Sequence, residues 1–139
     1  MRLNNWPKLL DDAITGARKK PFAWGQHDCC LFAADVAYAI TGVDAAKSLR
    51  GTYSTQEEAA LIISAAGGFN KLIDGLAAAH GWRQCATAAA RRGDLVQYES
   101  PDHDGPALGV CIGSMCMFTG PEGIAFVKLD KCSSAWRVE

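Results

Sequence analysis

The chain has 139 residues, of which 49% are hydrophobic and 21% are charged, and its formal net charge is −1. This composition excludes an intrinsically disordered chain and favours one compact domain over residues 1–139. The balanced charge, without a long basic run, argues against a nucleic-acid partner, and no apolar run approaches the ~20 residues of a transmembrane helix.

Residues 5–18 are predicted to form the first helix, with Asn5 as its N-cap and Pro7 in its first turn. Apolar side chains recur there at helical spacing and form one stripe: Trp6, Leu9, Leu10, Ala13, Ile14 and Ala17. In the loop that follows, Phe22 and Trp24 are expected to anchor the chain on the core, although they could instead wall a substrate groove. The N-terminus has no apolar signal core, so synthesis in the cytoplasm without export is expected.

The segment 29–41 is almost wholly apolar and carries one charge, Asp35. A helix that is apolar on nearly all sides is a buried helix, so this segment is predicted to be the central helix of the fold. Asp28 can cap its N-terminus, and Gly42 is expected to end it as a C-cap residue.

Thr55 and Glu58 form a capping box, which predicts a helix to about residue 66, and a further helix is expected over residues 69–80. From Trp82 onward, helical spacing gives way to short strand-like runs separated by turn residues. Strands are predicted at 82–85, 95–98, 107–112, 115–119 and 124–129, with a helical turn at 130–135 before a final 136–138.

Helices that precede a meander of strands predict an α+β fold. The buried central helix, at about residues 28–41, should pack on a C-terminal antiparallel sheet. No linker is long enough to separate two domains, so a single domain is predicted.

The six cysteines are expected to be reduced thiols in a reducing compartment: Cys29, Cys30, Cys85, Cys111, Cys116 and Cys132. Zinc sites usually contain two closely spaced cysteine pairs, and here Cys111 and Cys116 form the only candidate pair. Both lie in strand-like runs, where cysteine is commonly a small core residue. Buried thiols are therefore favoured over a metal or iron–sulfur site, and no cofactor or metal is predicted.

Cys29 follows the capping Asp28, in the first turn of the central helix. A thiol at a helix N-terminus is where a cysteine nucleophile is expected, because the helix dipole stabilises the thiolate. Cys29 is therefore the candidate nucleophile, and Asp28 is assigned as the helix cap.

The pair Asp28-Cys29, followed by Gly93-Asp94-Leu95-Val96 and a strand ending in glycine, resembles the papain-like cell-wall cysteine peptidases of the NlpC type. The match covers roughly residues 22–119. It implies a papain-like fold, with Cys29 as nucleophile, a histidine on the sheet two residues before a glycine, and a third polar residue that orients this histidine. In such a site the histidine activates the thiol and protonates the leaving amine.

The sequence departs from that pattern at the histidine. Ala107 falls at the position of the histidine, and Phe118 or Thr119 falls at the position of the third residue. Two catalytic roles are therefore vacant, which favours a pseudoenzyme. If the thiol is active, its base must be His27, in the entering loop, or His103, in the loop before the key strand.

The resemblance is closer to a group of small phage and prophage proteins, and it covers nearly the whole chain. These proteins share a loop like Phe-x-Trp-Gly-x-His-Asp-Cys, a segment like Leu49-Arg50-Gly51-Thr52-Tyr53, and an ending like Ala135-Trp136-Arg137. The resemblance implies a structural or assembly component of a phage tail tip, made in the bacterial cytoplasm and located in the virion, with other tail-tip or hub proteins as partners. The alternative is an active peptidoglycan amide hydrolase, with peptidoglycan as its substrate.

Overall fold

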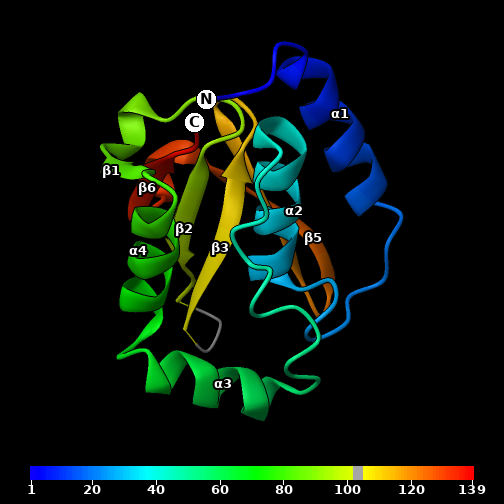
Figure 1. Cartoon of the computed structure of the whole chain (residues 1–139), viewed down its shortest axis with the longest axis vertical. Coiled ribbons are helices and arrows are strands. Elements are labelled where there is room, and N and C mark those ends of the chain that lie inside the picture. Colours follow the sequence, from blue (N-terminus) through cyan, green and yellow to red (C-terminus); the bar gives the residue numbers. More distant parts are fainter. Residues whose placement is uncertain (102–104) are drawn as a thin grey trace.

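The computed structural model describes residues 1–101 and 105–139 (Figure 1). Within them the α-helices are α1 (Trp6–Ala17), α2 (Cys29–Thr41), α3 (Gln56–Ala65) and α4 (Phe69–Ala79). The strands are β1 (Arg83–Cys85), β2 (Leu95–Glu99), β3 (Pro106–Cys111), β4 (Met115–Gly120), β5 (Gly123–Lys128) and β6 (Ser134–Arg137). Short 3-10 turns form η1 (Thr87–Ala89) and η2 (Leu129–Lys131). Helices precede an antiparallel sheet, so the α+β prediction is confirmed.

The sheet has the order β1-β6-β2-β3-β4-β5, and the strand pairs are antiparallel. Strands β2 to β5 form the predicted meander. The last strand leaves this meander, because β6 inserts between β1 and β2. The helical turn predicted over 130–135 is shorter than expected, since η2 ends at Lys131 and β6 begins at Ser134.

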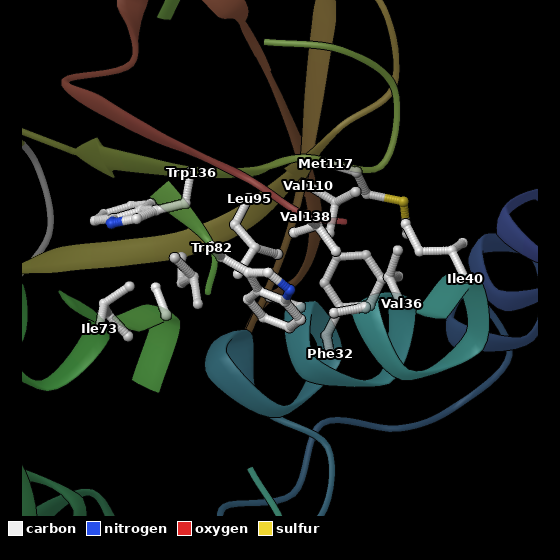
Figure 2. Packing of buried hydrophobic residues seen from close by; sticks show 14 of the residues in the cluster. Phe32, Val36, Ile40, Ile73, Trp82, Leu95, Val110, Met117, Trp136 and Val138 are labelled. Carbon is white, nitrogen blue, oxygen red and sulfur yellow. The ribbon is translucent and has the colours of Figure 1, made fainter. Parts of the chain in front are cut away.

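Helix α2 lies against the sheet and supplies the centre of the core. Its side chains Phe32, Val36 and Ile40 are fully buried. Figure 2 shows them facing side chains of the sheet and its flanking segments, among them Trp82, Leu95, Val110, Met117 and Val138, while Trp136 lies at the other end of the cluster, near Ile73 of α4. Full burial of one such aliphatic or aromatic side chain contributes about 1.5–3 kcal/mol, so this contact is the main stabilising interface of the fold.

Local capping explains where several helices begin and end. Gly42 takes the left-handed conformation with φ of 79°, and its N–H donates to the Tyr38 carbonyl oxygen at 2.7 Å. The Thr55 hydroxyl accepts from the Glu58 N–H at 3.1 Å, as the capping box predicts. Asn5 occupies the N-cap position of α1, but its side chain makes no capping hydrogen bond.

Taken one at a time, none of the helices in residues 1–101 and 105–139 is long and apolar enough to cross a membrane. Helices α3 and α4 together, bent by 70° at their junction, pass that test by length and composition.

Asp94 joins the two ends of the chain. Its buried carboxylate accepts from Arg2 Nη2 at 2.8 Å and from the Val138 N–H at 3.0 Å. The Arg91 N–H donates to its second oxygen at 2.8 Å, which closes the turn before β2. The aspartate of the Gly-Asp-Leu-Val run therefore links both termini to the sheet.

Candidate functional site

The loop before α2 is closed by two backbone hydrogen bonds between Ala23 and His27, of 2.9 and 2.8 Å. Gly25 lies at its tip with φ of 77°. A Cβ atom on Gly25 would lie 1.8 Å from the Tyr53 carbonyl oxygen, so only glycine fits there. Trp24 packs with Leu31 and other buried residues, in the manner expected of an anchor for the loop.

Asp28 is the N-cap of α2 and also a buried junction, because its side chain is 2% exposed. One oxygen accepts from the Leu31 N–H at 3.0 Å. The other accepts from the Gly25 N–H at 3.0 Å and from the Tyr53 hydroxyl. One carboxylate therefore fixes the loop, the start of the helix and the connector that contains Tyr53.

The connector after α2 is fastened by Arg50. Its guanidinium contacts Asp44 at 2.8 and 3.1 Å and Asp35 of α2 at 2.8 Å. The Gly51 N–H donates to the Gly25 carbonyl oxygen at 2.9 Å. In the sequence, the Leu49–Tyr53 run was noted only for its resemblance to other proteins. Residue spacing does not reveal that Arg50 and Gly51 contact Asp35 and Gly25, which lie at least 15 positions earlier in the chain.

Cys29 is half-buried at the first residue of α2. Its Sγ lies 3.9 Å from Cys30 Sγ. That contact is the largest of the effects that lower the pKa of Cys29. A hydrogen bond from the Leu108 backbone N–H also lowers this pKa, whereas burial of the thiol raises it. The pKa of Cys30 is raised by the same contact between the two thiols and by burial, so Cys29 is the thiol of this pair that loses its proton more readily.

His27 precedes the thiol in sequence, but its ring is turned toward α2 further along. The ring lies edge-on to Phe32 at 6.3 Å, and Nδ1 is 4.0 Å from Asp35 Oδ2. His80 ends α4, with Nδ1 2.9 Å from the Leu76 carbonyl oxygen. His103 lies outside the described residues. In the part of the chain that the structure describes, no hydrogen bond or ion pair joins an imidazole to Cys29.

His27 is expected to make the fold less stable in mild acid. Burial lowers its pKa below the usual 6.5, with Lys20 acting in the same direction and Asp35 opposing. Near pH 6.5 the His27 side chain therefore binds a proton in the unfolded chain but stays neutral in the folded chain. Because the unfolded state binds more protons, the free energy of unfolding falls as the pH drops through and below that value. Urea unfolding of His27→Gln at pH 7.5, 6.5 and 5.5 should show a shallower pH dependence than the wild type.

The matched control for this experiment is His80→Gln, which removes an imidazole at the end of α4 instead of the one near Asp35. Equal pH dependence in the wild type and His27→Gln would show that His27 is not the titrating group.

Strand β3 passes beside the thiol, and its residues alternate between the two faces of the sheet. Leu108 faces α2 and is 3% exposed, within the cluster that contains Phe32. Ala107 packs on the opposite face, with the cluster that contains Phe118 and Tyr98. The ring of Phe118 lies 6.0 Å from that of Tyr98. The position at which the resemblance requires a histidine and one of the two candidates for its orienting residue are therefore filled by apolar packing, while the other candidate, Thr119, is a buried hydroxyl residue.

The surroundings of the cysteine pair offer little room. A cavity of about 30 Å³ lies beside Cys30, and its walls are almost entirely apolar: Ala34, Ala45, Ala46, Leu49, Ile73, Leu76, Ala77, Trp82, Leu95 and Leu108. That volume suits about one water-sized group. A larger hollow of about 450 Å³ opens elsewhere, between η1 and the ends of β4 and β5, and includes Ser114 and Lys128 in its lining.

Three cysteines lie away from Cys29, in the apolar cluster that contains Phe118, on the face of the sheet opposite α2, which we call the second apolar cluster. Cys111, Cys116 and Cys132 are buried, and Cys111 lies directly opposite Cys116 across β3 and β4. A hydrogen bond to Cys116 lowers the pKa of Cys111 to about 7. Within residues 1–101 and 105–139, no group of three or more His, Cys, Asp or Glu side chains is arranged to hold a metal ion.

Comparison with known proteins supports the fold. The chain is similar in structure to the NlpC/p60 domain of the peptidoglycan hydrolase SagA, with a TM-score of 0.56 and 17% sequence identity. The alignment covers 96% of this chain and 98% of that domain, which confirms the predicted papain-like NlpC-type fold. No curated protein matches the sequence. Residues 1–138 match the family described as "Domain of unknown function (DUF6950)", and the chain therefore belongs to that family.

Proposed function

We propose that the chain is a non-hydrolytic domain with the NlpC/p60 fold, which serves as a structural or assembly component of a phage tail tip. One observation carries the non-hydrolytic part: the Cys29 thiol has neighbouring thiol and backbone groups but no hydrogen-bonded imidazole among the described residues. The resemblance of the whole chain to phage and prophage proteins supports the tail-tip part.

The chemistry of amide cleavage explains the weight given to the imidazole. A thiolate can attack an acyl carbon, but the leaving amine must receive a proton from a positioned acid. Cys30 is a poor acid for this purpose, because its pKa is raised well above that of a free thiol. The apolar packing of Ala107 and Phe118 supplies no alternative group.

The stretches on which the resemblance to phage proteins rests contain several contacts that stabilise the fold. Gly25, Asp28 and Tyr53 lock the loop and the connector to the start of α2. Near the C-terminus, Trp136 is 2% exposed and its indole N–H donates to Asp74 at 2.9 Å. A sequence that keeps the scaffold without the catalytic partners suits a protein that is used for its shape. On this proposal the domain is located in the virion and contacts neighbouring tail-tip or hub proteins.

An active peptidoglycan amide hydrolase is the second candidate. The lowered pKa of Cys29 at a helix N-terminus favours it, since a thiolate is the nucleophilic form. The base would be His103, or His27 after its ring turns away from Asp35.

We expect the purified protein to leave the amide bonds of peptidoglycan fragments intact. The free amino groups in the fragments should therefore not exceed those measured with Cys29→Ala. Cys85→Ala provides a matched control, because Cys85 is also a half-buried thiol but lies on β1, among the second apolar cluster. Mass spectrometry of the fragments measures the outcome, with an active NlpC/p60 hydrolase as the positive control. Cleavage that Cys29→Ala abolishes and Cys85→Ala retains would establish the hydrolase instead, and His103→Ala and His27→Ala would then identify the base.

The tail-tip assignment has a separate test in a phage or prophage that encodes the chain. Deletion of the gene should lower the yield of infectious particles by orders of magnitude, and the Cys29→Ala allele should restore the wild-type titre. Normal particles after deletion would rule out the structural role, whereas failure of the Cys29→Ala allele would favour thiol chemistry.

A further inference from the structure

Strand β5 forms one end of the sheet, on the side away from β1 (Figure 1). It pairs with β4 along its whole length, from Met115 opposite Lys128 to Gly120 opposite Gly123. Within residues 1–101 and 105–139, no backbone hydrogen bond reaches its other edge. A strand edge of this kind presents unpaired N–H and C=O groups, which can template another strand.

The register identifies which backbone groups are free. The Ile112 N–H donates to the Met115 carbonyl oxygen at 2.9 Å, so the odd-numbered residues of β4 direct their backbone groups toward β3. The even-numbered residues of β4 then bond to the odd-numbered residues of β5. The bond from the Leu129 N–H to the Ser114 carbonyl oxygen, at 2.9 Å, follows the same alternation just beyond the strand ends. It follows that the N–H and C=O groups of Ile124, Phe126 and Lys128 point outward.

The two ends of the sheet differ in how well they resist an added strand. The edge strand β1 has three residues and exposes Arg83 and Gln84, and short length and charge are devices that protect an edge. Strand β5 has six residues, lacks proline, and exposes the aromatic ring of Phe126 at 45%. The open edge at β5 therefore has the length and apolar character of a binding strand.

The charges beside this edge indicate the kind of segment that would bind there. The Arg18 guanidinium lies 5.8 Å from the centre of the Phe126 ring. Lys128 is exposed two residues further along β5, on the same face of the strand as Phe126. Two cations thus flank the free backbone groups, while the acidic Glu122 and Asp130 lie beyond the two ends of β5.

We propose that the outer edge of β5 binds an extended, acidic segment of another protein by strand addition. Backbone hydrogen bonds to Ile124, Phe126 and Lys128 would supply affinity, and acidic side chains facing Arg18 and Lys128 would supply specificity. A second copy of the chain is a poorer occupant. If two β5 strands paired antiparallel through these outward groups, the twofold axis would pass at Phe126, the middle of the three residues. The Arg18 side chains of the two copies would then lie close together, and their like charges would repel.

Three synthetic ten-residue peptides test the proposal on the full chain by fluorescence anisotropy. One alternates valine and glutamate, the second alternates valine and lysine, and the third is the glutamate peptide with N-methyl groups on the amides of one edge. The glutamate peptide is expected to bind at least about tenfold more tightly than the lysine peptide, a difference of about 1.4 kcal/mol. N-methylation should abolish binding, because it blocks the added hydrogen bonds.

Variants of the edge separate backbone from side-chain contributions. Phe126→Pro removes an outward N–H that β4 does not use, so it should weaken binding well beyond the effect of Phe126→Ala. The double variant Arg18→Glu/Lys128→Glu reverses the charge on both sides of Phe126, with loss of the Arg18 contact to its ring, and should reverse the preference toward the lysine peptide. Thermal unfolding of each variant verifies that the fold is retained.

The proposal fails if none of the peptides binds up to 1 mM, or if the acidic and basic peptides bind equally. A dimer in light scattering that Phe126→Pro converts to monomer would show that a second copy occupies the edge instead. The experiment involves no thiol chemistry, so its outcome is independent of whether Cys29 is catalytic.

Discussion

Asp94→Ala is expected to destabilise the fold by about 3–5 kcal/mol, the usual cost of removing one partner from a buried ion pair. The carboxylate is fully buried, and the side chain of its ion-pair partner Arg2 is only 8% exposed. Without Asp94, the Arg2 guanidinium loses its counter-charge, and the N–H groups of Val138 and Arg91 lose their acceptor. Because small domains have only about 5–15 kcal/mol of total stability, the midpoint of urea unfolding should fall steeply.

The matched control is an exposed ion pair of the same composition. Lys8 and Asp12 lie 2.9 Å apart on α1, with side chains that are 77% and 61% exposed. Asp12→Ala should cost no more than about 0.5 kcal/mol, because solvent screens the pair. Similar urea midpoints for Asp94→Ala and Asp12→Ala would mean that the junction of the two termini does not hold the fold together.

Sequence reasoning succeeded for features that are encoded locally. The span 29–41 was predicted from its apolar composition, and Gly42 and the Thr55–Glu58 capping box mark element ends through residues only three or four positions apart. The strand pattern was also readable, since short apolar runs between turn residues give β2 to β5 nearly at their observed bounds.

Features that depend on distant partners could not be predicted. The insertion of β6 between β1 and β2 is decided by pairings such as Gln97 with Ser134, which no local pattern encodes. The same limit hid the contacts of Arg50 with Asp35 and Asp44. At the site, the sequence placed Cys29 at the start of the helix, but the rotation of the His27 ring toward Asp35 follows from tertiary packing alone.

Asp28→Ala is expected to destabilise the fold by about 3–7 kcal/mol, several times the cost of losing an ordinary helix cap. Loss of the cap to the Leu31 N–H accounts for about 1 kcal/mol. The Gly25 N–H and the Tyr53 hydroxyl also lose their acceptor in a buried site, at about 1–3 kcal/mol for each unsatisfied group. Urea unfolding monitored by circular dichroism measures the change.

Thr55→Ala is the natural control, because Thr55 caps α3 through the same kind of bond but in an exposed position. It should cost about 1 kcal/mol. A much larger loss for Asp28→Ala would assign this aspartate to the junction of loop, helix and connector, the role that its contacts indicate. Equal losses would leave Asp28 as a simple cap beside Cys29, and the Asp-Cys pair would then be better explained by thiol chemistry. The difference between the two caps therefore bears directly on whether this stretch is kept for shape or for catalysis.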